Sequence, residues 1–304
     1  MPRGVPKSGF RRSKNWKRAH GLSASTVTSL KNAKLEKGAA EILPVSTETD
    51  AEIRVKLKDR IAAMEKMAIA TVAGMTKSLI ISGPPGVGKS YRVLRVASAY
   101  ESKGRTVGVV KGFVRATGLY KTLYDNRHSH CVVIFDDADS IFADDASLNL
   151  LKSACDMTRS RRLSWLAETR MEDEDGEKLP RSFEFEGSIV FITNYDFDYL
   201  INKGNKLSPH FEAMISRSIY MDMAMKTRRD YLMMIRMVVE DEKMLDQHGF
   251  SAEDQKQILD FVDTNCEKLR ELSLRMVIKI SNLFRMDPKD WQKLVRVTCF
   301  RNQG

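Results

Sequence analysis

The stretch SLIISGPPGVGKSYRVLRVASAYE, residues 78–101, decides the fold. Its first five residues form an apolar run that is typical of a buried strand, and a helical stretch follows from residue 89. Between them, Gly83–Ser90 matches the pattern G-x-x-x-x-G-K-[ST] in full. Glycines let backbone N–H groups turn toward phosphate oxygens, and the start of the next helix adds partial positive charge. The order of strand, loop and helix therefore predicts a phosphate-binding loop.

The last two residues of this loop indicate what it binds. Lys89 is placed to reach the β- and γ-phosphates of a nucleotide, and the Ser90 hydroxyl is placed to ligate Mg²⁺. We therefore expect a nucleoside triphosphate and Mg²⁺ as the bound pair, and the resemblance given below implies that the nucleotide is ATP. The residues expected at the phosphates are Gly83, Pro84, Pro85, Gly86, Val87, Gly88, Lys89 and Ser90.

Acidic side chains follow a second apolar run. Residues 131–135 read as a strand, and Asp136 and Asp137 come directly after it. We expect Asp136 to hold Mg²⁺ and Asp137 to polarise the attacking water as a general base. The alternative is an acidic loop that caps a helix from Ser140 onward.

A third polar residue, Asn194, follows the apolar strand 188–193. An amide at a strand end can orient the lytic water, although a lone Asn there is also an ordinary turn residue. The order of strand and loop, strand and acids, strand and Asn favours the functional interpretation.

Strands and helices alternate along the rest of the chain. Such apolar runs between helices indicate a parallel sheet covered on both faces. We expect strands at 78–82, 106–110, 131–135 and 188–193, and a hairpin within 163–186. We expect helices at 50–74, 89–102, 117–126, 145–158, 226–247, 251–269, 273–286 and 288–298. The predicted class is α/β, a P-loop parallel sheet sandwiched by helices, followed by a small C-terminal all-helical lid. The predicted domains are a basic, disordered tail (1–45), a nucleotide-binding domain (46–224) and the lid (225–304).

By these motifs the chain resembles the AAA+ ATPase superfamily over residues 77–285, and the resemblance implies ATP hydrolysis. Gly83–Ser90 resemble Walker A, Asp136 and Asp137 resemble Walker B, and Asn194 resembles sensor 1. Glu is commoner than Asp at the position of Asp137, and the shorter side chain reaches roughly 1 Å less far. This departure puts the rate of hydrolysis in doubt more than nucleotide binding.

Two arginines gain a role from the same resemblance. Arg217, in the segment 207–220, is similar to the clamp-loader-like Ser-Arg that supplies an arginine finger to a neighbouring subunit. Arg275 resembles a sensor 2 residue that faces the nucleotide in cis, with Ser273 as the N-cap of its helix. Rival residues for the contact in trans are Arg159, Arg161 and Arg162.

A finger supplied in trans implies a homo-oligomer, hexameric or an open ring. The compact single module also resembles stand-alone ATPases of bacteriophage genomes. In AAA+ rings the segment after the second strand often lines the pore, and Phe113 falls there. Phe113 either grips a threaded polymer together with Lys111 or belongs to the core.

The positive charge is concentrated at the N-terminus. Residues 1–45 carry ten Lys and Arg against two Glu, which is +8 of the total of +10. A flexible cationic arm can bind nucleic acid through counterion release, although a merely solubilising tail has the same composition. With neither a signal peptide nor an apolar run of membrane-spanning length, we expect a cytoplasmic protein, or one of the host cytoplasm if phage-encoded.

Three functions remain open from the sequence. The first is an oligomeric ATPase that loads or remodels a nucleic-acid-associated component in replication or recombination. The second is a protein unfoldase or chaperone-type remodeller, and the third is an ATP-gated switch without hydrolysis.

Overall fold

Five parallel strands form the central sheet, in the order β2-β3-β6-β1-β7. The computed structural model describes residues 48–166, 171–172, 176–204 and 206–301. The strands are β1 (Ser78–Ser82), β2 (Thr106–Lys111), β3 (Cys131–Asp136), β6 (Ser188–Thr193) and β7 (Ile219–Asp222). The three central strands are buried at every position, which explains why their sequences are continuous apolar runs. The predicted α/β class is confirmed.

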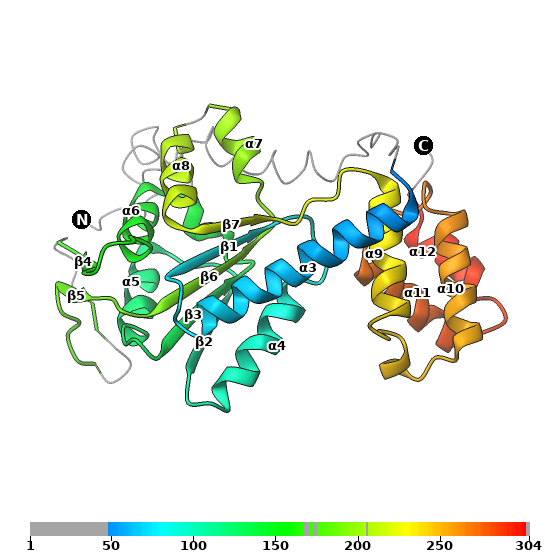
Figure 1. Ribbon diagram of the computed structural model, residues 1–304, viewed down its shortest axis with the longest axis horizontal. Coiled ribbons are helices and arrows are strands. Elements are labelled where there is room, and N and C mark those ends of the chain that lie inside the picture. The colour runs from blue at the N-terminus through cyan, green and yellow to red at the C-terminus, as the bar shows by residue number, and fades with distance from the viewer. Residues whose placement is uncertain (1–47, 167–170, 173–175, 205, 302–304) are drawn as a thin grey trace, which may run out of the picture.

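Alternate residues of each central strand face two separate cores. In β1, Leu79 and Ile81 belong to one cluster, whereas Ile80 belongs to the other. The first face is covered by α3 (Asp50–Val72) and α4 (Lys89–Glu101) (Figure 1). The predicted helix 50–74 is thus confirmed. It begins at a capping box of Thr49 and Glu52 and stops before Gly74.

The second face carries shorter helices. They are α5 (Ala116–Asp125), α6 (Asp145–Ala154), α7 (Phe197–Asn202) and α8 (Ser208–Arg217), with a 3₁₀ turn at Asp139–Phe142. Helix α6 ends at Ala154, so the prediction that it continues to residue 158 is wrong. The buried Arg161 side chain donates to the Ala154 carbonyl at 2.8 Å and closes the helix there. The predicted hairpin is present as β4 (Arg162–Ser164) and β5 (Ser182–Glu184), paired antiparallel.

A cluster of helices follows β7 and lies beside one end of the sheet (Figure 1). They are α9 (Arg228–Glu240), α10 (Ala252–Thr264), α11 (Leu274–Met286) and α12 (Trp291–Cys299), with a 3₁₀ turn at Asp246–His248. We call α9–α12 the lid. Ser273 caps α11 through the Met276 N–H, as predicted. Helix α9 stops seven residues earlier than the predicted 247, because the chain turns at Lys243, whose φ is +54°.

Helix α3 packs against both the sheet and the lid. Along its length it contacts α4, β1, β6 and α9 (Figure 1). Arg54 of α3 forms ion pairs with Glu240 and Asp241 at the end of α9. The predicted boundary between residues 224 and 225 stays a prediction, and the tail 1–45 lies outside the described residues. None of the described helices has the length and apolarity needed to cross a membrane.

Candidate nucleotide-binding site

The carboxyl ends of three adjacent strands bring the predicted site residues together. The loop Gly83–Ser90 follows β1, Asp136 and Asp137 lie at the end of β3, and Asn194 follows β6. Ligands of open parallel sheets bind in the crevice outside these carboxyl ends. The three motifs thus lie together at the carboxyl ends of the strands, although more than a hundred residues separate the first motif from the last.

The phosphate-binding loop lies directly against the lid. The Leu274 N–H of α11 donates to the Gly86 carbonyl at 2.9 Å. A Cβ added to Gly86, whose φ is +77°, would approach the Ser273 Cβ to 2.6 Å. Only glycine fits here, because the residue needs both a left-handed backbone and the absence of a side chain.

Lys89 is buried beneath the loop, with 6% of its surface exposed. Its ammonium donates to the carbonyls of Gly83 and Pro84 at 2.7 and 2.8 Å and to Asn194 Oδ1 at 3.1 Å. Burial lowers the pKa of Lys89 to about 8; the Asp137 carboxylate opposes this shift and the Arg275 charge adds to it. Three acceptors thus hold the ammonium in place beneath the loop.

The residues expected to hold Mg²⁺ contact each other. Ser90 Oγ donates to Asp136 Oδ1 at 2.7 Å, and the Asp136 carboxylate is almost fully buried. Mg²⁺ takes oxygen ligands, so a hydroxyl and a buried carboxylate side by side fit this ion. The second oxygen of Asp136 accepts from Lys111 at 2.8 Å, a contact that sequence reasoning missed.

Asp137 has an unusual backbone conformation for a residue with a side chain. Its φ is +54°, a left-handed value that Asp tolerates better than most residues, and its N–H donates to the Ile192 carbonyl. The Asn194 amide donates to Asp137 Oδ1 at 2.8 Å. Lys89, Asn194 and Asp137 therefore form one hydrogen-bonded chain.

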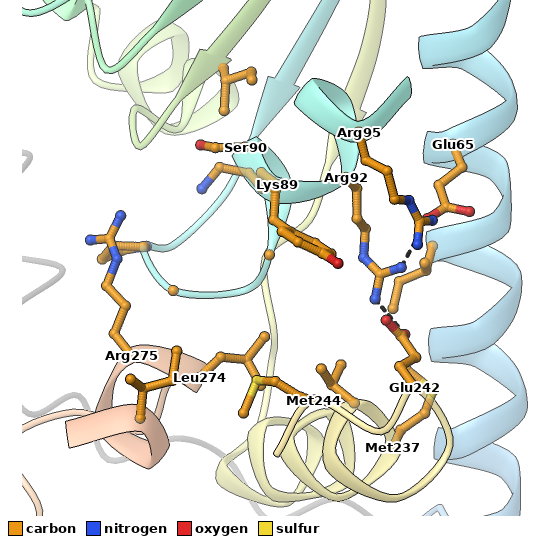
Figure 2. A pocket seen from close by; sticks show the side chains of 18 of the residues that line it. Glu65, Lys89, Ser90, Arg92, Arg95, Met237, Glu242, Met244, Leu274 and Arg275 are labelled. Atoms are coloured by element: carbon orange, nitrogen blue, oxygen red, sulfur yellow. Dashed lines mark hydrogen bonds and ion pairs between the residues drawn. The ribbon is translucent and has the colours of Figure 1, made fainter. Parts of the chain in front are cut away.

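A cavity of about 700 Å³ opens between the loop and the lid (Figure 2). Eight of the predicted site residues line it: Pro85, Gly86, Gly88, Lys89, Ser90, Asp137, Asn194 and Arg275. In Figure 2, Arg275 extends from α11 toward the loop. Apolar side chains from α3, α9 and α11 complete one part of the wall: Ile61, Met237, Val238, Leu274 and Ile278. The cavity thus offers polar groups at the loop and an apolar wall beyond it, as a nucleotide requires.

A charged cluster in the same wall was missed from the sequence. Arg92 of α4 pairs with Glu65 of α3 at 2.9 Å and with Glu242 after α9, and Arg95 pairs with Glu65 at 2.8 Å (Figure 2). We call these four residues the wall cluster. From the sequence, Arg92 looks like an exposed cation on a helix. Glu65 and Glu242 come next to it only in the folded chain.

Arg217 lies at the amino-terminal ends of the strands, on the side of the sheet away from the loop. Its carbonyl accepts from Ser78 at the start of β1, about 16 Å along that strand from the loop. It therefore does not line the chain's own cavity, and its role in trans stays a prediction. The rival Arg161 is buried by bonds to the Ala154 and Gly187 carbonyls and lies over Phe185, so the prediction that it can reach a neighbour is wrong.

Comparison with known proteins agrees with this geometry. The model of the ATPase family associated with various cellular activities (AAA) matches residues 79–193. An uncharacterized 36.7 kDa protein of Enterobacteria phage T4, from the nrdC-mobD intergenic region, is 32% identical over 248 residues, which is 80% of this chain and 74% of that protein.

Two similar solved structures share 15% and 13% of residues with this chain. The Thermotoga maritima RuvB Holliday junction branch migration motor is 15% identical with a TM-score of 0.42, over 84% of this chain and 72% of that one. NtrX from Brucella abortus in complex with ATP is 13% identical with a TM-score of 0.38, over 90% and 68%. On the family match and the phage relative, this chain belongs to the AAA family and is an ATPase.

Proposed function

We propose that the chain binds Mg-ATP in the cavity between the loop and the lid and hydrolyses it through Asp137 and Asn194. The observation that carries this proposal is the hydrogen-bonded chain Lys89–Asn194–Asp137 at the end of the loop. A γ-phosphate bound at the loop competes for the Lys89 ammonium. This frees Asn194 Oδ1 to orient a water molecule, and Asp137, held by the Asn194 amide, accepts its proton.

Ser90 and Asp136 are the proposed residues at Mg²⁺, which offsets the charge of the phosphates when bound. Asp136, which now accepts from Ser90 and Lys111, would hold the ion directly or through a water molecule. Arg275 is the proposed cis contact to the phosphates, because it lines the cavity from the lid.

We propose further that the active form is a homo-oligomer, a hexamer or open ring, in which Arg217 of one subunit completes the site of the next. Its support is the position of Arg217 at the sheet edge away from its own loop. A cation delivered there by a neighbour would stabilise charge on the transferred phosphoryl group. Arg159 and Arg162 remain exposed alternatives.

Mixing two inactive variants tests this arrangement. Lys89→Ala removes the site but keeps the finger, whereas Arg217→Ala keeps the site but loses the finger. In a head-to-tail ring, an equimolar mixture should recover about a quarter of the wild-type turnover, since half of the intact sites gain an intact neighbour. A mixture as inactive as its components would contradict the shared site.

The proposed role is remodelling or loading of a nucleic-acid-associated component in the cytoplasm. Its support is the charge of +8 in residues 1–45, because a basic arm binds the phosphate backbone without reading sequence. The test measures ATP turnover with single-stranded DNA, duplex DNA and an unfolded protein. Stimulation by DNA that disappears on deletion of residues 2–40 supports this role, and stimulation by the unfolded protein alone contradicts it.

One observation favours protein remodelling as a second candidate. Phe113, just after β2, is 77% exposed, so the interpretation of this residue as core is wrong. An exposed aromatic ring next to Lys111 can grip a polypeptide. In that case Phe113→Ala should abolish stimulation by unfolded protein and leave basal turnover unchanged.

A further inference from the structure

Arg92 has a buried donor that the protein itself leaves unpaired. Its side chain is only 5% exposed, and its two terminal nitrogens are occupied by Glu65 and Glu242. The third nitrogen, Nε, is buried and has no hydrogen-bond partner among the described residues. A buried N–H without a partner costs free energy, so an acceptor supplied by a ligand would recover that cost.

The unpaired Nε faces the gap between the phosphate-binding loop and the lid. It lies 3.6 Å from the position that a Cβ on Gly88 would occupy, and Leu274 Cδ1 lies 3.7 Å from the same position. Arg92, Gly88 and Leu274 all line the 700 Å³ cavity. Figure 2 shows the Arg92 side chain extending from α4 toward Glu242, on the side away from Arg275. Less than 1 Å² of Nε itself is exposed, so a ligand in this cavity reaches the atom once the side chains that cover it shift.

The charges of the wall cluster indicate which part of a nucleotide is recognised. Arg92 and Arg95 carry two positive charges, and Glu65 and Glu242 carry two negative ones. The cluster is neutral and gives no net attraction for a phosphate. It leaves one oriented N–H beside an apolar wall, which suits a neutral acceptor such as a ribose oxygen or a purine ring nitrogen.

We propose that Arg92 is a nucleoside-recognising residue, which donates Nε–H to the sugar or base of the bound nucleotide. This rests on the proposed Mg-ATP site. Glu65 of α3 and Glu242 beside the lid fix the guanidinium in place. Because Glu242 follows α9, the same arginine links nucleoside binding to the position of the lid.

Replacement of Arg92 by Lys isolates the Nε–H. Lysine keeps a cation for Glu65 and Glu242 but has a methylene where arginine has Nε. The binding of Mg-tripolyphosphate, Mg-ribose 5-triphosphate and Mg-ATP to the full chain is measured by calorimetry. For Arg92→Lys we expect ATP affinity to fall about tenfold, which is about 1.4 kcal/mol, with tripolyphosphate affinity unchanged. The loss appears already with ribose 5-triphosphate if a sugar oxygen is the acceptor, and only with ATP if a ring nitrogen is.

A matched control is Arg95→Lys. Arg95 lies one helical turn away and pairs with the same Glu65, but its side chain is 55% exposed. We expect its ATP affinity to stay within twofold of wild type. Equal losses for ATP and tripolyphosphate in Arg92→Lys, or no loss for either, would overturn the nucleoside contact. A wild-type chain that binds neither ligand would instead refute the proposed Mg-ATP site.

Discussion

Raising the pH from 7 to 9 should weaken ATP binding because Lys89 loses its proton in the free protein. With a pKa of about 8, Lys89 is about 90% protonated at pH 7 and about 10% protonated at pH 9. A phosphate accepts only the protonated form as a cationic partner. If the complex keeps Lys89 protonated, the affinity falls about tenfold, or about 1.4 kcal/mol, over this range. Phosphates lose their second proton near pH 6, so their own charge is almost constant in this window.

Titration calorimetry measures both the affinity and the proton uptake. At pH 8, binding in two buffers of different ionisation enthalpy should show uptake of about half a proton per ATP. Lys89→Arg is the control, because arginine stays charged throughout and its affinity, even if lower, should not vary with pH. A wild-type affinity that is flat from pH 7 to 9, without proton uptake, would refute the reasoning.

The same pKa has the opposite effect on folding. An unfolded chain keeps the Lys89 proton up to about pH 10.5, whereas the folded chain releases it near pH 8. Between these values the unfolded state binds more protons, so the Lys89 contribution to the free energy of unfolding rises with pH. Binding and stability should therefore respond to alkaline pH in opposite directions.

Three further substitutions have defined outcomes. Asp137→Asn should keep ATP affinity and lose turnover at least about a hundredfold in a phosphate-release assay, since an amide cannot accept the proton; wild-type turnover would place the base elsewhere. Gly86→Ala should lower ATP affinity at least about tenfold, because its Cβ meets Ser273. Gly104→Ala, at a similar φ with nothing within 4 Å, controls for backbone strain in the same calorimetric measurement. Arg161→Met should lower the free energy of unfolding by about 2–4 kcal/mol in urea titrations, because it leaves the Ala154 and Gly187 carbonyls unpaired. Exposed Arg162→Met should change that free energy by less than about 0.5 kcal/mol, and equal effects of the two would contradict this account.

Local patterns predicted the elements well where one strong signal decides the conformation. The buried strands appear as apolar runs. Gly74 marks a helix end through its left-handed backbone, and Ser273 marks a helix start through its side-chain cap. The strand order was out of reach of such reasoning. The position of β1 between β6 and β7 depends on pairing between segments more than a hundred residues apart.

The site residues were predictable where each belongs to a local motif, and not where a contact depends on tertiary packing alone. Lys89, Ser90, Asp136 and Asn194 follow from strand ends that meet at one edge of the sheet. The ion pair of Lys111 with Asp136 and the burial of Arg92 come from tertiary packing, and no spacing in the sequence encodes them. The end of α6 at Ala154 has the same origin, because the residue that closes it, Arg161, reaches back from beyond the helix.

The hydrogen bond from the Leu274 N–H to the Gly86 carbonyl joins the loop and the lid through main-chain atoms alone. Every amino acid except proline supplies that N–H, so divergence of the side chain at position 274 leaves the link intact. Leu274 is also the first residue of α11, where proline is accepted by a helix without loss of an internal hydrogen bond. In related chains, a proline at this position would therefore remove this main-chain link between lid and loop while the helix survived.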